Sequence, residues 1–269
     1  MRDTIKGLDY FRNYIANGSI LHKKRVKEIS QKKVPKERIE IVKADMSKNQ
    51  LYICIAKYSS GYPVVNLLED YYSAVYLSYE GWKGKGSWKI NDGEIDLNQY
   101  GISAYNQMLN MLSLGYLFNI PSEKFQTLVE IIDRDGIKDE LFEFIISAKL
   151  SDRQPIESES YQRYFGIPEA YSRLRNIIDL PNKEEAAEQM DMYLKKDWYN
   201  IQKDTGVKDL HNSRHDIYYG YWSFEAAAVV KIMGLDDSSF IDNQYYPKDL
   251  VHPPMEEPKK KGFLGRLGL

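Results

Sequence analysis

Apolar residues recur at intervals of three or four along most of the chain, which is the spacing of one face of an α-helix. A clear example is the stripe formed by Val64, Leu68, Tyr71, Val75 and Tyr79. Similar stripes predict further helices over residues 3–33, 35–58, 98–119, 122–135, 137–148, 182–205 and 207–233. The pattern therefore predicts an all-α fold of antiparallel helical hairpins, packed as a bundle or a solenoid-like array.

One stretch departs from the helical spacing. Residues 82–96 have strand character, with apolar residues on both sides of an Asn-Asp-Gly turn at 91–93. Such a turn between short apolar runs is typical of a β-hairpin. We expect at most one small hairpin near residues 86–97, and an ordered loop is the alternative.

Polar and proline-containing segments indicate how the chain is divided. Residues 151–158 are polar and contain Pro155, so they are the candidate boundary between an N-terminal helical domain, 1–150, and a C-terminal helical domain, 151–258. The second domain ends in a proline-containing segment that cannot continue a helix. Residues 259–269 are predicted to form a flexible basic tail.

The last predicted helix is apolar on nearly every side from residue 217 onward, and such a helix belongs in the middle of a bundle. Glu225 lies within this apolar stretch, and a buried carboxylate needs a polar partner. The candidate partners are Tyr221, Arg173, Arg175 and Arg214. We interpret Glu225 as a structural residue rather than a catalytic one.

The composition is that of an ordinary globular protein, with 43% hydrophobic and 28% charged residues among 269. No secretory-type apolar region lies near residue 1, and no apolar run reaches the roughly 20 residues of a membrane span. Cys54 is the only cysteine, which excludes an intramolecular disulfide and a cysteine-rich zinc site. These features predict a cytoplasmic protein without stable membrane association.

Charge is distributed unevenly along the sequence. Residues 1–60 contain 14 Lys and Arg against 6 Asp and Glu, a net +8. Residues 61–258 contain 19 against 33, a net −14, and the tail contains 4 against 0, a net +4. An acidic body repels nucleic acid and attracts basic partners. We therefore expect a basic protein partner and no direct binding of nucleic acid.

A metal site is the main alternative that carries chemistry. His211 and His215 are four residues apart, a spacing compatible with a shared metal, and Asp216 is the only adjacent carboxylate. The glutamate of the metalloprotease helix motif is absent, and surface or hydrogen-bonded histidines explain the spacing better. We expect no metal, no cofactor and no enzymatic activity, with a metal-dependent enzyme as the less favoured alternative.

The segment Arg-His-Asp-Ile-Tyr-Tyr-Gly-Tyr-Trp-Ser-Phe-Glu-Ala-Ala-Ala at 214–228, followed by Asp-Asp at 236–237 and Tyr-Tyr-Pro-Lys-Asp-Leu at 245–250, is distinctive. It closely resembles the C-terminal domain of the PoNi family, the immunity proteins of polymorphic nuclease effector (PoNe) toxins. Residues 1–130 are similar in outline to the family's N-terminal domain, from Met-Arg-Asp to the Tyr-Ser-Ser-Gly-Tyr-Pro stretch at 58–63.

The resemblance implies an all-helical protein that binds a DNase toxin of a contact-dependent bacterial competition system and neutralises it. A helical-repeat interaction scaffold is the alternative function. We expect partner contacts from acidic positions at helix ends and loops with two aromatic anchors, namely Asp209, Asp216, Asp236, Asp237, Asp242, Tyr245 and Tyr246. The expected structural core of the family motif comprises Arg214, Tyr221, Trp222, Phe224 and Glu225. A second acidic cluster comprises Glu69, Asp70, Asp92, Glu94 and Asp96.

Overall fold

The computed structural model describes residues 1–83, 87–91, 96–153 and 170–253. Helices dominate these ranges, so the predicted all-α class is confirmed. Within them, no helix combines the length and the apolar character needed to cross a membrane. The predicted boundary at 151–158 overlaps the residues that are not described, and the tail 259–269 lies wholly among them.

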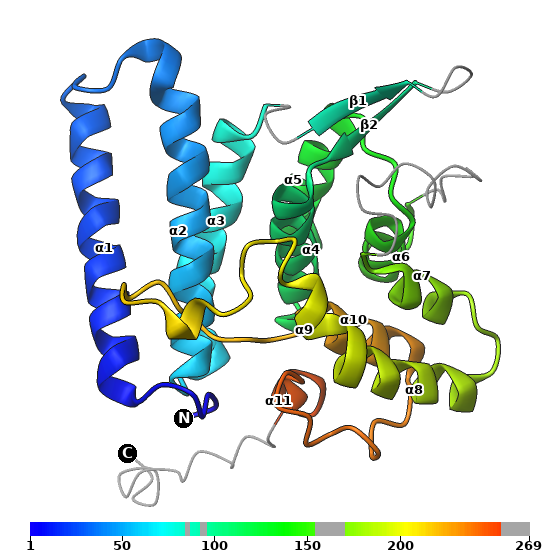
Figure 1. The fold of residues 1–269 in the computed structure, drawn as a ribbon. Helices are drawn as coiled ribbons and strands as arrows, with labels where there is room; N and C mark the ends of the chain where they lie inside the picture. Colours follow the sequence, from blue (N-terminus) through cyan, green and yellow to red (C-terminus); the bar gives the residue numbers. More distant parts are fainter. Residues whose placement is uncertain (84–86, 92–95, 154–169, 254–269) are drawn as a thin grey trace, which may run out of the picture.

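Three long helices form one side of the molecule: α1 (Leu8–Ser30), α2 (Ile39–Ser59) and α3 (Leu68–Gly81). Two 3₁₀ turns precede α2 and α3, namely η1 (Lys36–Arg38) and η2 (Val64–Asn66). In Figure 1, α2 lies between α1 and α3. Phe11 is the only buried residue of α1, whereas α2 and α3 each bury several residues. The helix α1 therefore covers one side of α2 and contributes little to the core.

A two-stranded antiparallel sheet follows α3. Strand β1 (Ser87–Asn91) pairs with β2 (Asp96–Tyr100) so that Ser87 lies opposite Tyr100 and Asn91 lies opposite Asp96. This register confirms the small β-hairpin and excludes the alternative of an ordered loop. The hairpin leads directly into the next helix.

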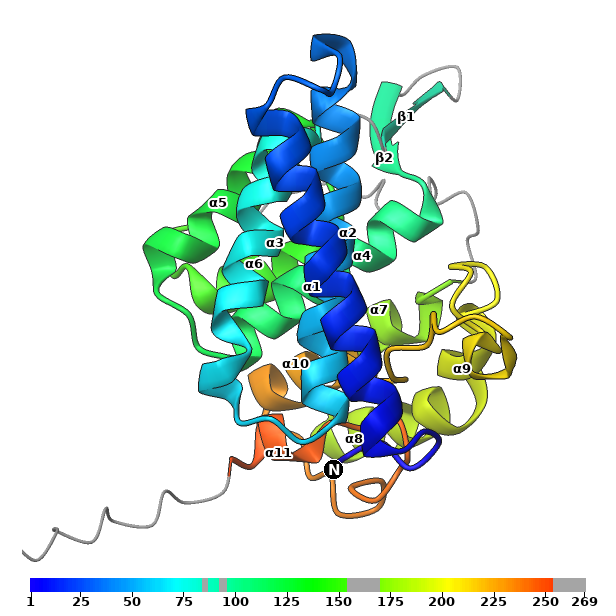
Figure 2. The same cartoon turned by 90° about the vertical axis from the view of Figure 1, so that its left-hand side faces the viewer.

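The remaining elements pack beside the three long helices (Figures 1 and 2). The first group comprises α4 (Ile102–Leu117), α5 (Ser122–Arg134) and α6 (Glu140–Lys149). The second comprises α7 (Ser172–Ile178), α8 (Lys183–Met192), the π-helical turn η3 (Tyr193–Asp197) and α9 (Trp198–Ile201). The third comprises η4 (Leu210–Asn212), α10 (Phe224–Met233) and α11 (Lys248–Val251).

The centre of the molecule is the contact between α4 and α10. Every residue from Phe224 to Val230 is buried, as expected for a helix that is apolar on all sides. One hydrophobic cluster includes α4 and α10 and extends from Phe11 to Leu250. Residues from both halves of the sequence thus share a single core.

The predicted helix over 207–233 is wrong for residues 207–223, which form no α-helix and contain only the 3₁₀ turn η4; residues 213–223 are not helical at all. The backbone of this segment bonds to the N-terminal half instead. The N–H of Tyr218 donates to Tyr10 Oη at 2.9 Å, and the carbonyl of Tyr219 accepts from Ser59 Oγ at 2.8 Å. Because these tertiary bonds replace helical ones, residues 218–221 are buried without forming a helix.

The predicted helix over 182–205 is divided into α8, η3 and α9. Its predicted start is confirmed, since Asn182 Oδ1 accepts hydrogen bonds from the N–H groups of Glu184 at 2.9 Å and Glu185 at 3.2 Å. Such a cap satisfies two of the four free N–H groups at a helix N-terminus.

Candidate interaction site

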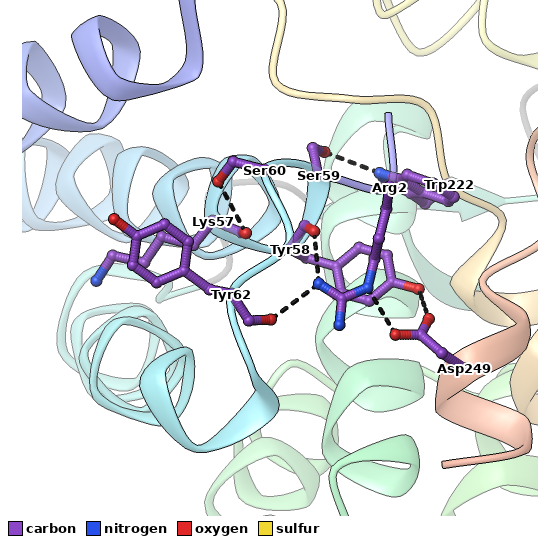
Figure 3. Close-up of polar contacts among 8 residues, drawn as sticks. All are labelled: Arg2, Lys57, Tyr58, Ser59, Ser60, Tyr62, Trp222 and Asp249. Carbon is purple, nitrogen blue, oxygen red and sulfur yellow. Dashed lines mark hydrogen bonds and ion pairs between the residues drawn. The ribbon is translucent and has the colours of Figure 1, made fainter. Parts of the chain in front are cut away.

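The first residues of the chain are bound to α11 through the side chain of Arg2. Its Nε donates to Asp249 Oδ2 at 2.6 Å, and its terminal nitrogen donates to the carbonyls of Tyr58 at 2.9 Å and Tyr62 at 2.8 Å (Figure 3). The guanidinium carbon lies 4.4 Å from the centre of the Tyr58 ring, and the Tyr58 hydroxyl donates to Asp249. One arginine therefore joins the N-terminus, the end of α2 and α11.

Ser59, at the end of α2, contacts the segment around Gly220. Its Oγ accepts a hydrogen bond from Trp222 Nε1 at 2.8 Å (Figure 3). The same Oγ donates to the Tyr219 carbonyl at 2.8 Å. Gly220 has a φ of +117°, and a Cβ there would lie 2.0 Å from Ser59 Oγ. Only glycine fits this close approach without displacing its neighbours. We call the set Arg2, Tyr58, Ser59, Trp222 and Asp249 the N-terminal junction.

Each residue of the N-terminal junction lies in a segment that carried the family resemblance. These segments are the opening Met-Arg-Asp, the stretch at 58–63, the stretch around 220 and the stretch at 245–250. Burial and the neighbouring Asp249 raise the pKa of Tyr58, so its hydroxyl keeps the proton that it donates. These residues hold the two halves of the chain together, which is a structural role.

The expected core of the motif is largely present. Tyr221, Phe224 and Glu225 are buried, and Trp222 is half-buried against the core. Arg214 is exposed, so its assignment to the core is wrong.

Glu225 obtains its partners from hydroxyl groups. Its Oε1 accepts from Tyr193 Oη at 2.8 Å and from Ser223 Oγ at 2.9 Å. Burial raises the pKa of this carboxyl above its ordinary value. The suggested arginines are used elsewhere: Arg173 contacts Asp197, and Arg175 lies 3.6 Å from Asp139.

Four of the seven predicted contact residues lie at the surface: Asp209, Asp216, Asp236 and Asp242. Asp237 and Tyr246 are buried, so the expectation of exposed loop positions is wrong for them. The Tyr246 hydroxyl donates to Asp237 Oδ2 at 2.8 Å, and His252 Nε2 lies 2.7 Å from the same oxygen. The loop after α10 turns inward there because Phe240 and Tyr246 pack edge to face, 5.3 Å apart.

Tyr245 and Asp209, two of the predicted contact residues, are connected through Tyr199. The half-buried ring of Tyr245 stacks on Tyr199 with the centroids 5.5 Å apart, and the Tyr199 hydroxyl donates to Asp209 at 2.9 Å. Tyr245 and Asp242 also line a cleft of about 480 Å³ beside the N-terminal junction. The sequence pattern did not predict a role for Tyr199, because its partners Asp209 and Tyr245 are ten or more positions away along the chain.

The two histidines considered for a metal have other neighbours. His211 Nδ1 lies 2.9 Å from the Tyr221 hydroxyl, and His215 Nε2 lies 3.3 Å from Arg214 Nε. Over the residues that the structure describes, no three His, Cys, Asp or Glu side chains are grouped to hold a metal ion. The geometry gives the metal-dependent alternative no support.

The chain forms helices and one two-stranded sheet over its described residues, with exposed carboxylates and half-buried tyrosines at its surface. Two family descriptions match it: the N-terminal part of PoNe immunity proteins (PoNi) matches residues 7–130, and the C-terminal part matches residues 137–250. The chain belongs to the PoNe immunity protein family. The six residues between the two matches, 131–136, include the last turn of α5.

The crystal structure of protein PA2201 from Pseudomonas aeruginosa is similar, with a TM-score of 0.60 and 16% sequence identity. The similarity covers 93% of this chain and 89% of that chain, and it shows a shared fold. No curated protein sequence matches the chain.

Proposed function

We propose that this chain is a cytoplasmic immunity protein that binds a DNase toxin of a contact-dependent competition system one to one and neutralises it. The observation that carries the proposal is the match to the PoNe immunity family over residues 7–250, with a break of six residues between the two parts. The net charge of −14 over residues 61–258 supports a partner with a basic surface.

The physical basis is complementarity with a DNA-binding surface. A nuclease holds the phosphates of DNA in a basic cleft. Carboxylates on an inhibitor attract such a cleft from a distance and raise the association rate, while aromatic groups supply most of the contact energy. A protein seated in the cleft excludes DNA and thereby stops cleavage without any chemistry of its own.

The exposed aspartates of the C-terminal half fit the first of these two roles. We propose that Asp209, Asp216, Asp236 and Asp242 contribute to the electrostatic attraction of the toxin. Each is exposed, and Asp242 also contacts Lys248 Nζ at 2.6 Å. Tyr245, packed on Tyr199, remains a candidate contact at the edge of the cleft.

The test begins with the reading frame next to this gene, which the proposal predicts to encode a nuclease toxin. Expression of that nuclease alone is expected to kill the host and degrade its DNA, and co-expression of this chain is expected to restore growth. The purified pair is expected to co-elute as a 1:1 complex at moderate salt. If the two proteins do not associate, direct neutralisation is wrong. Recovery of several unrelated partners in place of one nuclease would favour the scaffold.

A further inference from the structure

The outward side of α3 has large apolar side chains that the fold does not cover. Val65 is 70% exposed, Tyr76 is 60% exposed and Tyr79 is 41% exposed. Tyr72 is half-buried and Glu69 is exposed on the same helix. The intervals between 69, 72, 76 and 79 are three, four and three residues, which places these four side chains on one face of α3. Val65 belongs to the 3₁₀ turn η2 just before the helix. We call this set the α3 ridge.

The opposite face of α3 already supplies the core. Tyr71 and Ala74 are fully buried there, and Ser78 hydrogen-bonds to Ser47 of α2. The α3 ridge is therefore not needed to complete the hydrophobic core. The outer face of a surface helix is normally polar, and a contiguous apolar patch in its place marks an interaction site.

The ridge is accessible in the folded chain. Figure 2 shows α3 between α2 and α5, and α3 is in contact with both helices. The shape of the ridge favours a concave partner. A helix with its side chains is about 10–12 Å across, so a single outward ridge is convex. When two convex ridges meet, they bury far less than the roughly 800 Å² per partner of a stable interface. A concave partner fits this surface better than a second copy of the chain.

The charges favour a basic partner. Residues 64–81 contain three carboxylates and no lysine or arginine. Lysines of α2 already neutralise two of them, through the pairs Lys57–Asp70 and Lys43–Glu80. Glu69 is exposed and forms no ion pair within the described part of the chain, so the ridge itself presents one uncompensated negative charge.

The neighbouring helix α5 extends the same surface. It exposes Glu123, Glu130 and Asp133 together with Lys124 and Arg134, and Asp133 pairs with Arg153. The guanidinium of Arg134 lies 5.7 Å from the centre of the Tyr79 ring, so an arginine of this chain already contacts that ridge tyrosine. The rings of Tyr72 and Tyr76 beside Glu69 suit the arginine and lysine side chains of a partner.

We infer that the α3 ridge is the contact surface that enters the basic, concave DNA-binding cleft of the toxin. This inference rests on the proposed function and specifies which surface performs it. The aspartates of the C-terminal half then act at longer range, through the association rate. The ridge tyrosines act at contact, through the dissociation rate.

The test measures binding of the full-length chain to a catalytically inactive form of the adjacent nuclease by biolayer interferometry. Tyr76→Lys and Glu69→Lys each place a cation against the basic cleft. Together they are expected to raise the Kd by at least about 30-fold, mainly through faster dissociation. The matched control is Ile20→Lys on α1, because Ile20 is 65% exposed and lies outside the ridge. The control is expected to change the Kd by less than about two-fold.

Thermal unfolding of each variant accompanies the binding data, and Tyr76→Ala replaces Tyr76→Lys if the latter unfolds early. If the wild-type chain binds the nuclease and the ridge variants bind it with the same Kd, the inference is wrong. The interface then lies at the surface around Asp209 and Tyr245. A wild-type dimer in light scattering that the ridge variants dissociate would assign the ridge to a second copy. Absence of wild-type binding would instead contradict the proposed function itself.

Discussion

Arg2 and Asp249 are 247 positions apart in sequence and are joined by a 2.6 Å ion pair. The pair is mostly shielded from solvent, with 22% of the arginine side chain and 29% of the aspartate side chain exposed. It connects the first residues of the chain to α11, the last helix of the described residues. Two ends of the sequence are thus held together in the folded chain.

Arg2→Ala is expected to lower the free energy of unfolding by about 2 kcal/mol, because three hydrogen bonds from a charged group are lost together. Urea denaturation measures this change. Arg12→Ala is the control, since its ion pair with Asp9 is 63% and 91% exposed. It is expected to change stability by less than about 0.5 kcal/mol. Equal stability of the two variants would show that the junction contributes nothing.

Gly220→Ala is expected to cost about 3 kcal/mol or to prevent folding. The new Cβ would lie 2.0 Å from Ser59 Oγ, and the φ of +117° is unfavourable for alanine. Gly206→Ala separates the two effects, because Gly206 also has a positive φ, +76°, but has open space around it. That control is expected to cost about 1 kcal/mol in thermal or urea unfolding. A Gly220 variant as stable as the Gly206 variant would contradict the close contact with Ser59.

Glu225→Gln is expected to change the pH dependence of stability. Burial raises the pKa of Glu225 in the folded chain above the unfolded value of about 4.3. The folded chain therefore binds the proton more tightly, and wild-type stability falls as the pH rises from the unfolded pKa through the folded one. Glutamine does not titrate, so the variant is expected to gain stability relative to wild type as the pH rises above the unfolded pKa of about 4.3. Parallel urea midpoints for the two proteins above that pKa would exclude the effect.

Asp236 and Asp237 are adjacent in sequence and are expected to respond differently to charge reversal. Asp236→Lys is expected to keep the fold and to slow toxin association modestly at low salt, because Asp236 is exposed. Asp237→Lys is expected to destabilise the chain by about 3 kcal/mol, because a buried cation replaces the acceptor of Tyr246. Thermal unfolding and association kinetics on both single variants check this. Equal unfolding temperatures for the two variants would contradict the burial of Asp237 and its hydrogen bond from Tyr246.

The sequence predicted the kinds of residue in the proposed site, but only the structure showed which of them are exposed. Acidic character and tyrosine content were evident from the sequence, and four of the seven predicted contact residues lie at the surface. The α3 ridge was not predicted, because Tyr79 was assigned to the inward stripe of its helix. In the structure, Tyr79 lies on the outward face with Tyr72 and Tyr76, and Tyr71 and Ala74 face the core. A helix with apolar residues on both faces does not reveal which face is covered.

The sequence by itself determined the elements whose stability is local. Helical spacing predicted α1 to α6 and a helix beginning near residue 182, and the apolar run at 224–230 predicted the buried helix α10. These features depend on contacts within a few residues, and such contacts are visible as spacing. The tertiary structure alone decided that residues 213–223 are not helical, that Asp237 is buried and that Arg2 meets Asp249. Each of these depends on hydrogen bonds between distant residues, and the spacing of side chains along the chain carries no record of such partners.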